Sequence, residues 1–187
     1  MSALRPKEER LLGRTGISIP RIGLGCATFG REIDEDASFA IMDYAAEHGI
    51  TLFDTAEAYG GGQAREYRRT KLGVDDQREV NGEMHSSEKI IGRWLRSRGC
   101  RQDIILVTKV TTNFTTAHVR EALDASLERL QTDFVDVYLF HQFDPKTPAE
   151  DGVAALNEVA QSDKARAVGC SNSMGKPLVR PVRLEEV

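Results

Sequence analysis

The sequence predicts an α/β fold in which parallel strands, covered by helices, form part of a βα barrel. Strand and helix patterns alternate four times along the 187 residues and end in a fifth strand, and such alternation is typical of parallel sheets. The strand segments are apolar throughout, as expected when both faces of a sheet are covered. Polar residues follow most of these strands, at the end where βα barrels carry their active sites.

The first elements are a hairpin and a strand. Residues 11–20 have the pattern of a short β-hairpin that turns at Thr15-Gly16, because a glycine between two short strand-like segments is a turn signal. The segment Arg21–Gly25 then has the composition of a buried strand, with glycines at a tight exit.

A helix, a second strand and an insertion follow. Asp34 or Asp36 can cap the N-terminus of this helix, and Gly49 can end it. The second strand is Ile50–Phe53. Residues 63–85 are charged and contain few apolar residues, so we interpret them as an inserted loop. A solvated surface loop is the simplest interpretation. A lid or an oligomer contact is the alternative, because the loop leaves from the expected catalytic face.

The rest of the chain repeats helix and strand three times. Apolar residues recur at helical spacing in the helical segments, a glycine ends the first of these helices, and a proline suits the first turn of the last. The elements are a helix from Ser86 to Gly99, a strand Ile104–Thr108, a helix from Thr115, a strand Phe134–Phe140, a helix from Pro148 and a strand Ala165–Cys170.

The length limits how much of a barrel this sequence can form. A complete barrel of eight units needs about 250 residues, and the pattern supplies a hairpin and five strands before an irregular tail at 173–187. We therefore expect one domain over 1–187 that is an incomplete barrel, with open edges on its first and fifth strands. The loss of pattern after Asn172 suggests a truncated or frameshifted product, marginally stable or self-associating through its exposed edges.

Composition and charge argue against several classes of protein. The chain is 40% hydrophobic and 29% charged, as in globular domains, and no apolar run approaches the about 18 residues of a membrane span. A net charge of -4 does not favour nucleic acid or an anionic membrane as a partner. Three widely spaced cysteines and an N-terminus without an apolar signal segment favour a reducing, cytoplasmic location.

Polar residues at the strand ends are the candidate catalytic groups. Asp54 follows the second strand, Lys109 the third and His141 the fourth, and Tyr59 lies five residues after Asp54. Since the carboxyl ends of parallel barrel strands open onto one face, these four side chains are expected to meet in one pocket. Asp, Tyr, Lys and His are the residue types that proton-coupled carbonyl reduction needs.

Each of these residues also has a purely structural interpretation. Asp54 can cap the next element, Tyr59 can be a half-buried core aromatic, and the other two can be ordinary loop or packed residues. The spacing His85-x-x-Glu88 is compatible with metal ligands, but it stands alone at a helix start. No metal site is therefore expected.

Seven short motifs occur in the same order as in a known family. They are Leu12–Gly16, Arg21–Gly25, Phe53–Gly60, Ser87–Gly92, Val107–Lys109, Asp136–His141 and Val168–Asn172. With this set, the chain resembles the aldo-keto reductase family over residues 11–172, interrupted by the insertion at 63–85. The resemblance implies a (β/α)8 TIM-barrel fold whose floor is closed by the N-terminal hairpin. It also implies NADPH-dependent reduction of aldehydes and ketones to alcohols.

The resemblance implies roles for individual residues as well. The residues that match the catalytic tetrad are Asp54, Tyr59, Lys109 and His141. The positions that match cofactor contacts are Gly25, Cys26, Asp54, Ser171 and Asn172. The last two of these match the pair that holds the nicotinamide carboxamide. Threonine is usual in the family at position 26, where this chain has cysteine.

In this chemistry we expect Tyr59 to be the general acid. A tyrosine hydroxyl has a reference pKa of about 10, and a neighbouring ammonium stabilises the phenolate that remains when the proton leaves. Lys109 would supply that ammonium, held by a charge-assisted bond to Asp54. His141 would hydrogen-bond the carbonyl oxygen and orient it.

Two classes of function stay open at this point. The first is an NADPH-dependent oxidoreductase that reduces a small-molecule carbonyl. The second is a catalytically inactive fragment, or a non-catalytic, reductase-like subunit that serves binding or assembly. The second class is kept because, in the family, the last three strands carry much of the dinucleotide site, and the sequence contains no matching segments.

Overall fold

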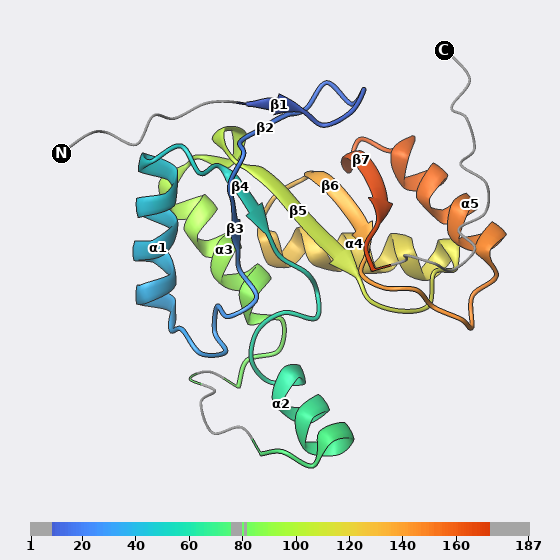
Figure 1. The fold of residues 1–187 in the computed structure, drawn as a ribbon, viewed down its shortest axis with the longest axis horizontal. Helices are drawn as coiled ribbons and strands as arrows, with labels where there is room; N and C mark the ends of the chain where they lie inside the picture. Colours follow the sequence, from blue (N-terminus) through green and yellow to red (C-terminus); the bar gives the residue numbers. More distant parts are fainter. Residues whose placement is uncertain (1–8, 76–79, 81, 173–187) are drawn as a thin grey trace.

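Five parallel strands form the central sheet of the protein (Figure 1). The computed structural model describes residues 9–75, 80 and 82–172. The strands are hydrogen-bonded in chain order and follow one another across the sheet. They are β3 (Gly23–Gly25), β4 (Leu52–Asp54), β5 (Ile105–Val110), β6 (Val135–Phe140) and β7 (Ala165–Cys170). All five predicted strands are present, with ends shifted by one or two residues.

A short antiparallel hairpin lies at the amino end of this sheet (Figure 1). Its strands are β1 (Arg10–Leu11) and β2 (Ser18–Ile19), joined by a turn closed by a 2.8 Å bond from the Leu12 amide to the Ile17 carbonyl. The predicted hairpin and its turn are therefore confirmed. Ile17 is buried against the sheet in the same apolar cluster as Val107 and Val137, so the hairpin covers the amino end of the sheet's inner face.

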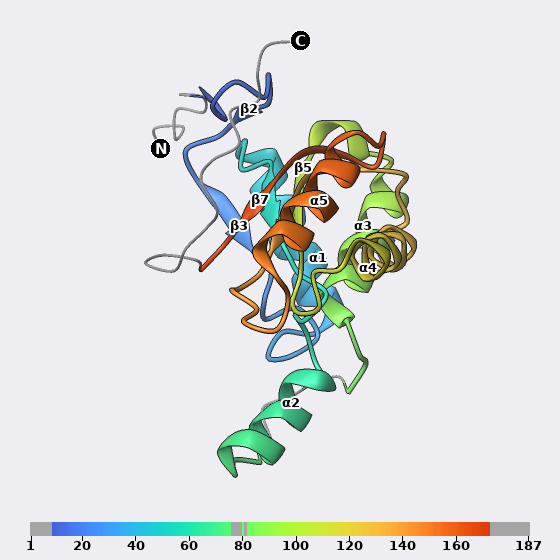
Figure 2. The ribbon, with the colours of Figure 1, turned by 90° about the vertical axis from the view of Figure 1, so that its right-hand side faces the viewer.

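Four longer helices cover the other face of the sheet (Figure 2). They are α1 (Glu35–Glu47), α3 (Ser86–Arg98), α4 (Thr116–Leu130) and α5 (Ala149–Ala160). The structure decides the cap of the first helix: the Asp34 carboxylate accepts a 2.9 Å bond from the amide of Ala37. Helices α3 and α4 approach closely at Gly92, where an added Cβ would lie 2.7 Å from the carbonyl carbon of Leu130.

The inserted segment is helical at its start, which corrects the prediction of a loop over 63–85. It contains α2 (Gln63–Tyr67) and a π-helical turn (Arg68–Leu72), and it projects away from the carboxyl end of the sheet (Figure 2). The Thr70 hydroxyl donates to the Glu66 carbonyl at 2.8 Å. Gly73 then ends the turn in the left-handed conformation. Local helix bonds of this kind satisfy the backbone even where few apolar residues are available for packing.

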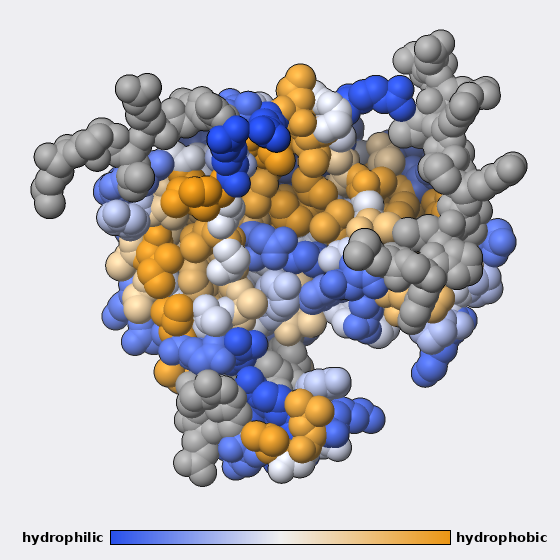
Figure 3. Space-filling model, in the orientation of Figure 1, coloured by the Kyte–Doolittle hydropathy of each residue, from blue (hydrophilic) through white to orange (hydrophobic). Residues whose placement is uncertain are grey.

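Side chains alternate between the two faces of the strands, and this alternation sets up two apolar clusters. The outward residues pack under the helices around Phe53, Trp94 and Tyr138. The inward residues include Leu52, Ile105, Val107, Val137, Leu139 and Ala167. Hydrophobic residues dominate the face below the hairpin in the space-filling view (Figure 3). Asp54 and Lys109 fall two residues after Leu52 and Val107, so strand parity directs both of them inward.

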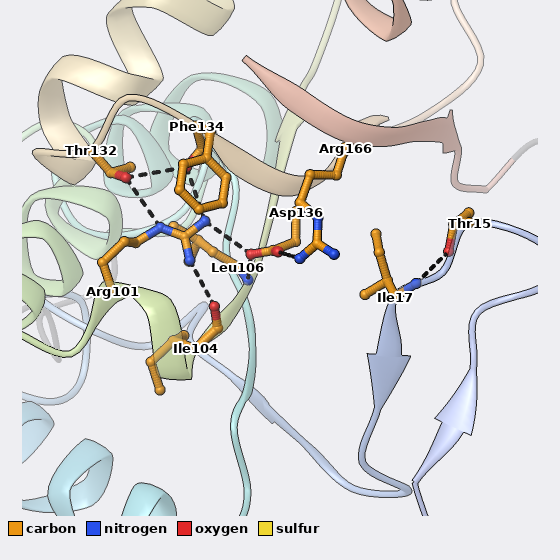
Figure 4. A network of polar contacts seen from close by, with 9 residues as sticks. All are labelled: Thr15, Ile17, Arg101, Ile104, Leu106, Thr132, Phe134, Asp136 and Arg166. Carbon is orange, nitrogen blue, oxygen red and sulfur yellow. Dashed lines mark hydrogen bonds and ion pairs between the residues drawn. The ribbon is translucent and has the colours of Figure 1, made fainter. Parts of the chain in front are cut away.

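A buried ionic network lies at the amino end of β5 and β6 (Figure 4). The Asp136 carboxylate, 3% exposed, accepts bonds from Arg101 at 2.9 Å, from Arg166 at 2.7 Å and from the amide of Leu106 at 2.9 Å. Arg101 follows α3 in a short 3₁₀ helix, Arg101–Asp103, and it also donates to two backbone carbonyls and to Thr132. Each polar group of this network therefore has a partner.

The two outer strands of the sheet are β3 and β7, and neither has a second neighbouring strand among the described residues. The predicted irregular tail, residues 173–187, lies outside the described residues. Within the part of the chain that the structure describes, none of the helices has the length and apolar character needed to cross a membrane.

Candidate active site

An ion pair between β4 and β5 forms the centre of the candidate site. The Lys109 ammonium donates to the Asp54 carboxylate at 2.6 Å and to the Thr55 carbonyl at 2.7 Å. The lysine side chain is 6% exposed, whereas the aspartate side chain is 37% exposed. The lysine ammonium is therefore buried, whereas the carboxylate that pairs with it is accessible to solvent. Such a charge-assisted pair fixes where the lysine ammonium points.

Tyr59 and His141 complete the group. Tyr59 lies in the loop after β4, with the Lys109 ammonium 4.7 Å from the centre of its ring. The His141 ring meets the Tyr59 ring edge to face, with 5.2 Å between the ring centres. The four side chains that the sequence predicted to meet are thus brought together at the carboxyl end of the sheet.

His141 follows β6, and its amide donates to the Val110 carbonyl at 2.8 Å. Burial, and then the positive charge of Lys109, lower the pKa of His141 from its ordinary value. The ring is therefore neutral near pH 7. Its Nδ1 is buried and has no hydrogen-bond partner among the residues that the structure describes. A neutral imidazole can donate from one nitrogen and accept at the other.

The residues predicted to contact a cofactor divide into two groups. Ser171 and Asn172 follow β7, and the Asn172 amide donates to the His141 carbonyl at 2.9 Å, so this pair adjoins the tetrad. Gly25 pairs in register with Asp54, and within the described part of the chain a Cβ at that glycine would meet no atom within 4 Å.

Cys26 differs from the other four. Its side chain is fully buried in the outer apolar cluster, and burial raises the pKa of its thiol. Its backbone forms hydrogen bonds to neighbouring elements: its amide donates to the Asp54 carbonyl and its own carbonyl accepts from Ser87. Any contact of Cys26 with a cofactor is therefore a contact of its backbone.

Glu57 is a site residue that the sequence reasoning missed. Its carboxylate accepts a 2.7 Å bond from the amide of Thr111, and its own amide donates to the Lys109 carbonyl at 3.1 Å. It therefore ties the loop that carries Tyr59 to the end of β5. The available signal was an acidic residue inside the small-residue stretch Thr55–Ala58.

Two other features lie apart from this site. A cavity of about 370 Å³ opens between α1 and α3, where Arg98 and the Trp94 indole both bind the Asp43 carboxylate and lower its pKa to about 2. None of the predicted site residues lines it. The His85-x-x-Glu88 spacing does not bring its two side chains onto one centre: His85 binds the Glu57 carbonyl, while Glu88 binds Thr108 and Arg129.

Comparison with known proteins identifies the family. Residues 21–177 match the model of the Aldo/keto reductase family. This chain is a member of the aldo/keto reductase family. Its curated relatives include the Bacillus subtilis oxidoreductase YrpG, 33% identical over 92% of this chain and 52% of the relative. The B. subtilis aldo-keto reductase YhdN is 34% identical over 88% of this chain and 47% of the relative. The chain thus spans about half the length of the curated relatives it matches.

Solved aldo-keto reductase structures share the fold. The enzyme AKR11C1 from Bacillus halodurans, in a holo form, superposes with a TM-score of 0.68 at 30% identity and covers 88% of this chain and 50% of its own. An aldo/keto reductase from Klebsiella pneumoniae, in complex with NADP and acetate, gives a TM-score of 0.65 at 30% identity, over 83% of this chain and 46% of its own. The prediction of an incomplete (β/α)8 barrel is thereby confirmed.

Proposed function

We propose that this aldo/keto reductase chain carries the proton-donating part of an NADPH-dependent reductase that converts an aldehyde or ketone to an alcohol. The observation that supports this most directly is the Lys109 ammonium, which contacts Asp54 at 2.6 Å and lies 4.7 Å from the ring centre of Tyr59. A buried cation held beside a tyrosine is the arrangement that general-acid chemistry by a phenol requires.

Tyr59 is the proton donor in this proposal. When its proton passes to the carbonyl oxygen, the phenolate that remains is stabilised by Lys109, whose charge Asp54 holds in place. His141, neutral because burial and Lys109 lower its pKa, donates a hydrogen bond to the same carbonyl oxygen and orients it. In this proposal, the charge that forms during the reaction lies beside a group of opposite charge.

The residues at the site fit a nicotinamide cofactor. Asn172 and Ser171 place amide and hydroxyl groups beside His141, where they can bind a carboxamide. A Cβ added at Gly25, which pairs in register with Asp54, would meet no atom of the described residues within 4 Å. NADPH would supply the hydride when bound. One of the family relatives, from Schizosaccharomyces pombe, is named an NADP(+) aldo-keto reductase, and the Klebsiella structure contains NADP.

The test is NADPH oxidation by the purified chain in the presence of an aromatic aldehyde, with cofactor binding measured in parallel by calorimetry. We expect saturable NADPH binding, and turnover that Tyr59→Phe abolishes while binding is retained. Tyr67→Phe is the matched control, because Tyr67 is an exposed tyrosine on α2 and its hydroxyl has no place in the proposal. Equal turnover by the Tyr59→Phe variant would disprove the proton-donor role.

The second candidate function is a non-catalytic subunit that associates through its sheet edges. The outer strands β3 and β7 each have one strand neighbour among the described residues, and the nearby Leu11 and Ile22 side chains are exposed. Unpaired strand edges favour pairing with another chain. A defined oligomer in light scattering, without NADPH binding, would support this function. A cytoplasmic location is also proposed, supported by three free cysteines at 26, 100 and 170.

A further inference from the structure

Four consecutive residues at the start of α3 contact the segments that carry three members of the tetrad. These members are Asp54, Tyr59 and Lys109. We call the four residues, His85–Glu88, the clasp. The side chains of Ser86, Ser87 and Glu88 are fully buried, although serine and glutamate are seldom buried in proteins without a specific partner. The tetrad chemistry assigns no role to any of the four.

Ser86 holds the chain immediately after Tyr59. Its hydroxyl donates to the Phe29 carbonyl at 3.0 Å and accepts from the amide of Gly61 at 2.8 Å. Gly60 lies against the same helix end, since an added Cβ there would lie 2.7 Å from the Ser86 nitrogen, and its φ is +113°. The backbone after Tyr59 therefore sits directly on the clasp, in a conformation that favours glycine.

His85 and Ser87 hold the chain before Tyr59. The His85 Nδ1 lies 2.5 Å from the Glu57 carbonyl. A carbonyl oxygen only accepts, so the nitrogen is the donor in this bond. The Ser87 hydroxyl donates to the Cys26 carbonyl at 2.8 Å and lies 2.8 Å from the Thr55 hydroxyl. Because a serine has a single hydroxyl proton, Thr55 is the donor in that second bond. Thr55 is adjacent to Asp54.

Glu88 extends the clasp to β5. One oxygen of its carboxylate accepts from the Thr108 hydroxyl at 2.6 Å, and the other accepts from Arg129 of α4 at 2.6 Å. Thr108 faces outward, and Lys109, the next residue, faces inward to the site. The bond therefore fixes the rotation of the strand at the position that carries the lysine.

We propose that the clasp positions the catalytic residues of the proposed reductase, with Ser86 as the principal positioning residue for Tyr59. This inference rests on the proposed function for its kinetic consequence, but its structural consequence can be tested separately. The clasp forms hydrogen bonds with residues on both sides of Tyr59 and with the immediate neighbours of Asp54 and Lys109. Reacting groups misplaced by about 1 Å can lose about 100-fold in rate, so a set of bonds at these positions has a direct effect on turnover.

The experiment compares Ser86→Ala with Ser38→Ala. Ser38, on α1, is the matched control because it is also a fully buried serine whose hydroxyl donates to a backbone carbonyl, that of the N-cap residue Asp34. Both variants are labelled with 3-fluorotyrosine and studied by ¹⁹F NMR. The chain has four tyrosines, and the Tyr59 signal is assigned with Tyr59→Phe. The other three signals report on the rest of the fold.

In Ser86→Ala we expect the Tyr59 signal to shift or broaden while Tyr44, Tyr67 and Tyr138 stay unchanged, and Ser38→Ala to leave all four signals in place. For the active chain, kcat should fall about 10- to 100-fold in Ser86→Ala, with the KM for NADPH within about twofold of the wild type. A loss of packing alone would not separate kcat from KM in this way.

An unchanged Tyr59 signal in Ser86→Ala would overturn the proposal, as would an equal disturbance of all four signals in both variants. If Ser86→Ala does not fold, His85→Ala takes its place, because His85 is only half-buried and its Nδ1 contacts the Glu57 carbonyl, on the other side of Tyr59. If the wild-type chain shows no turnover, the proposed function fails, and the ¹⁹F comparison alone decides the positioning role.

Discussion

At the carboxyl end of the sheet, Lys109 is buried beside a partly exposed aspartate, a tyrosine and a histidine whose Nδ1 has no partner among the described residues. At the amino end, Arg101 is largely buried, with a side chain 14% exposed, but its guanidinium contacts Asp136, Thr132 and two backbone carbonyls. Both ends therefore hold a buried cation beside a carboxylate. Among the described residues, every buried polar atom of the amino-end network has a partner, which is what an ion pair needs in order to stabilise a fold.

This difference distinguishes the site at the carboxyl end, which can react, from the network at the amino end, which stabilises the fold. Besides the His141 Nδ1, the Thr111 hydroxyl near the carboxyl end is buried without a partner among the described residues. Buried polar groups without partners cost free energy and are found at functional sites. The four predictions below test this comparison by removing equivalent groups from the two ends.

The largest expected effect comes from Lys109→Met. This change removes the ammonium from the candidate site but keeps most of the length of the side chain, so we expect turnover to fall by about 100- to 10,000-fold. Stability should fall less than in Arg101→Met, because Asp54 is open enough to be hydrated and only one backbone carbonyl, that of Thr55, loses its donor. NADPH oxidation and urea unfolding of the same preparation check both statements. A large loss of stability would show that this end also serves to hold the fold.

Arg101→Met is the corresponding change at the amino end. It leaves Asp136 buried with one partner fewer and two backbone carbonyls without their donor. We expect a loss of about 3 kcal/mol in the free energy of unfolding, measured by urea denaturation. The folded fraction should keep its turnover, in contrast to Lys109→Met. Stability equal to that of the wild type would contradict the structural role assigned to this network.

Arg166→Ala sharpens the comparison within the amino-end network. Arg166 is 50% exposed, whereas its partner Asp136 is 3% exposed. After the change, Asp136 keeps Arg101 and the amide of Leu106, so we expect a loss of only about 0.5–1 kcal/mol. High salt should reduce the difference between variant and wild type. A loss equal to that of Arg101→Met would mean that both arginines are needed to neutralise the carboxylate.

The smallest effect is a pH dependence of stability at the carboxyl end. The pKa of His141 is lowered in the folded state by burial and by Lys109, so the unfolded chain takes up a proton first as the pH falls below about 6.5. Folding stability should therefore decrease as the pH falls from about 6.5 to the lowered pKa. Urea midpoints of wild type and His141→Gln over this range measure it. His118→Gln, on α4, controls for the loss of a histidine, and an unaltered slope in His141→Gln would exclude this residue as the cause.

Most of the sheet and the meeting of the tetrad were predictable from the sequence, because both follow from local pattern. Apolar strands that end in Asp54, Lys109 and His141 must bring those residues to one edge once the strands are parallel. Strand boundaries near 52–54 differed by one or two residues, since hydrogen bonding and not hydropathy sets them. The helical start of the insertion was missed because its bonds are local and its composition is polar.

The amino-end network and the clasp were not predictable in the same way. Asp136 stands inside the apolar strand Val135–Phe140, and this was a signal that a partner was needed. Its partners Arg101 and Arg166 are 35 and 30 residues away, and the sequence contains many other basic residues. Ser86 and Ser87 have the appearance of an ordinary helix start, and only the folded structure shows that Gly60 and Gly61 rest on them.

The alternation of side chains along β4 and β5 has a consequence for how this protein can change. Leu52 and Val107 belong to the inner apolar cluster, and two residues later on the same face stand Asp54 and Lys109. Core residues and reactive residues thus occupy successive inward-facing positions of the same strand, and no residue belongs to both groups. Substitutions at the last inward-facing position of each strand can alter reactivity while the residue at the preceding inward-facing position maintains the fold. Catalytic properties and folding can therefore evolve, or be redesigned, largely independently.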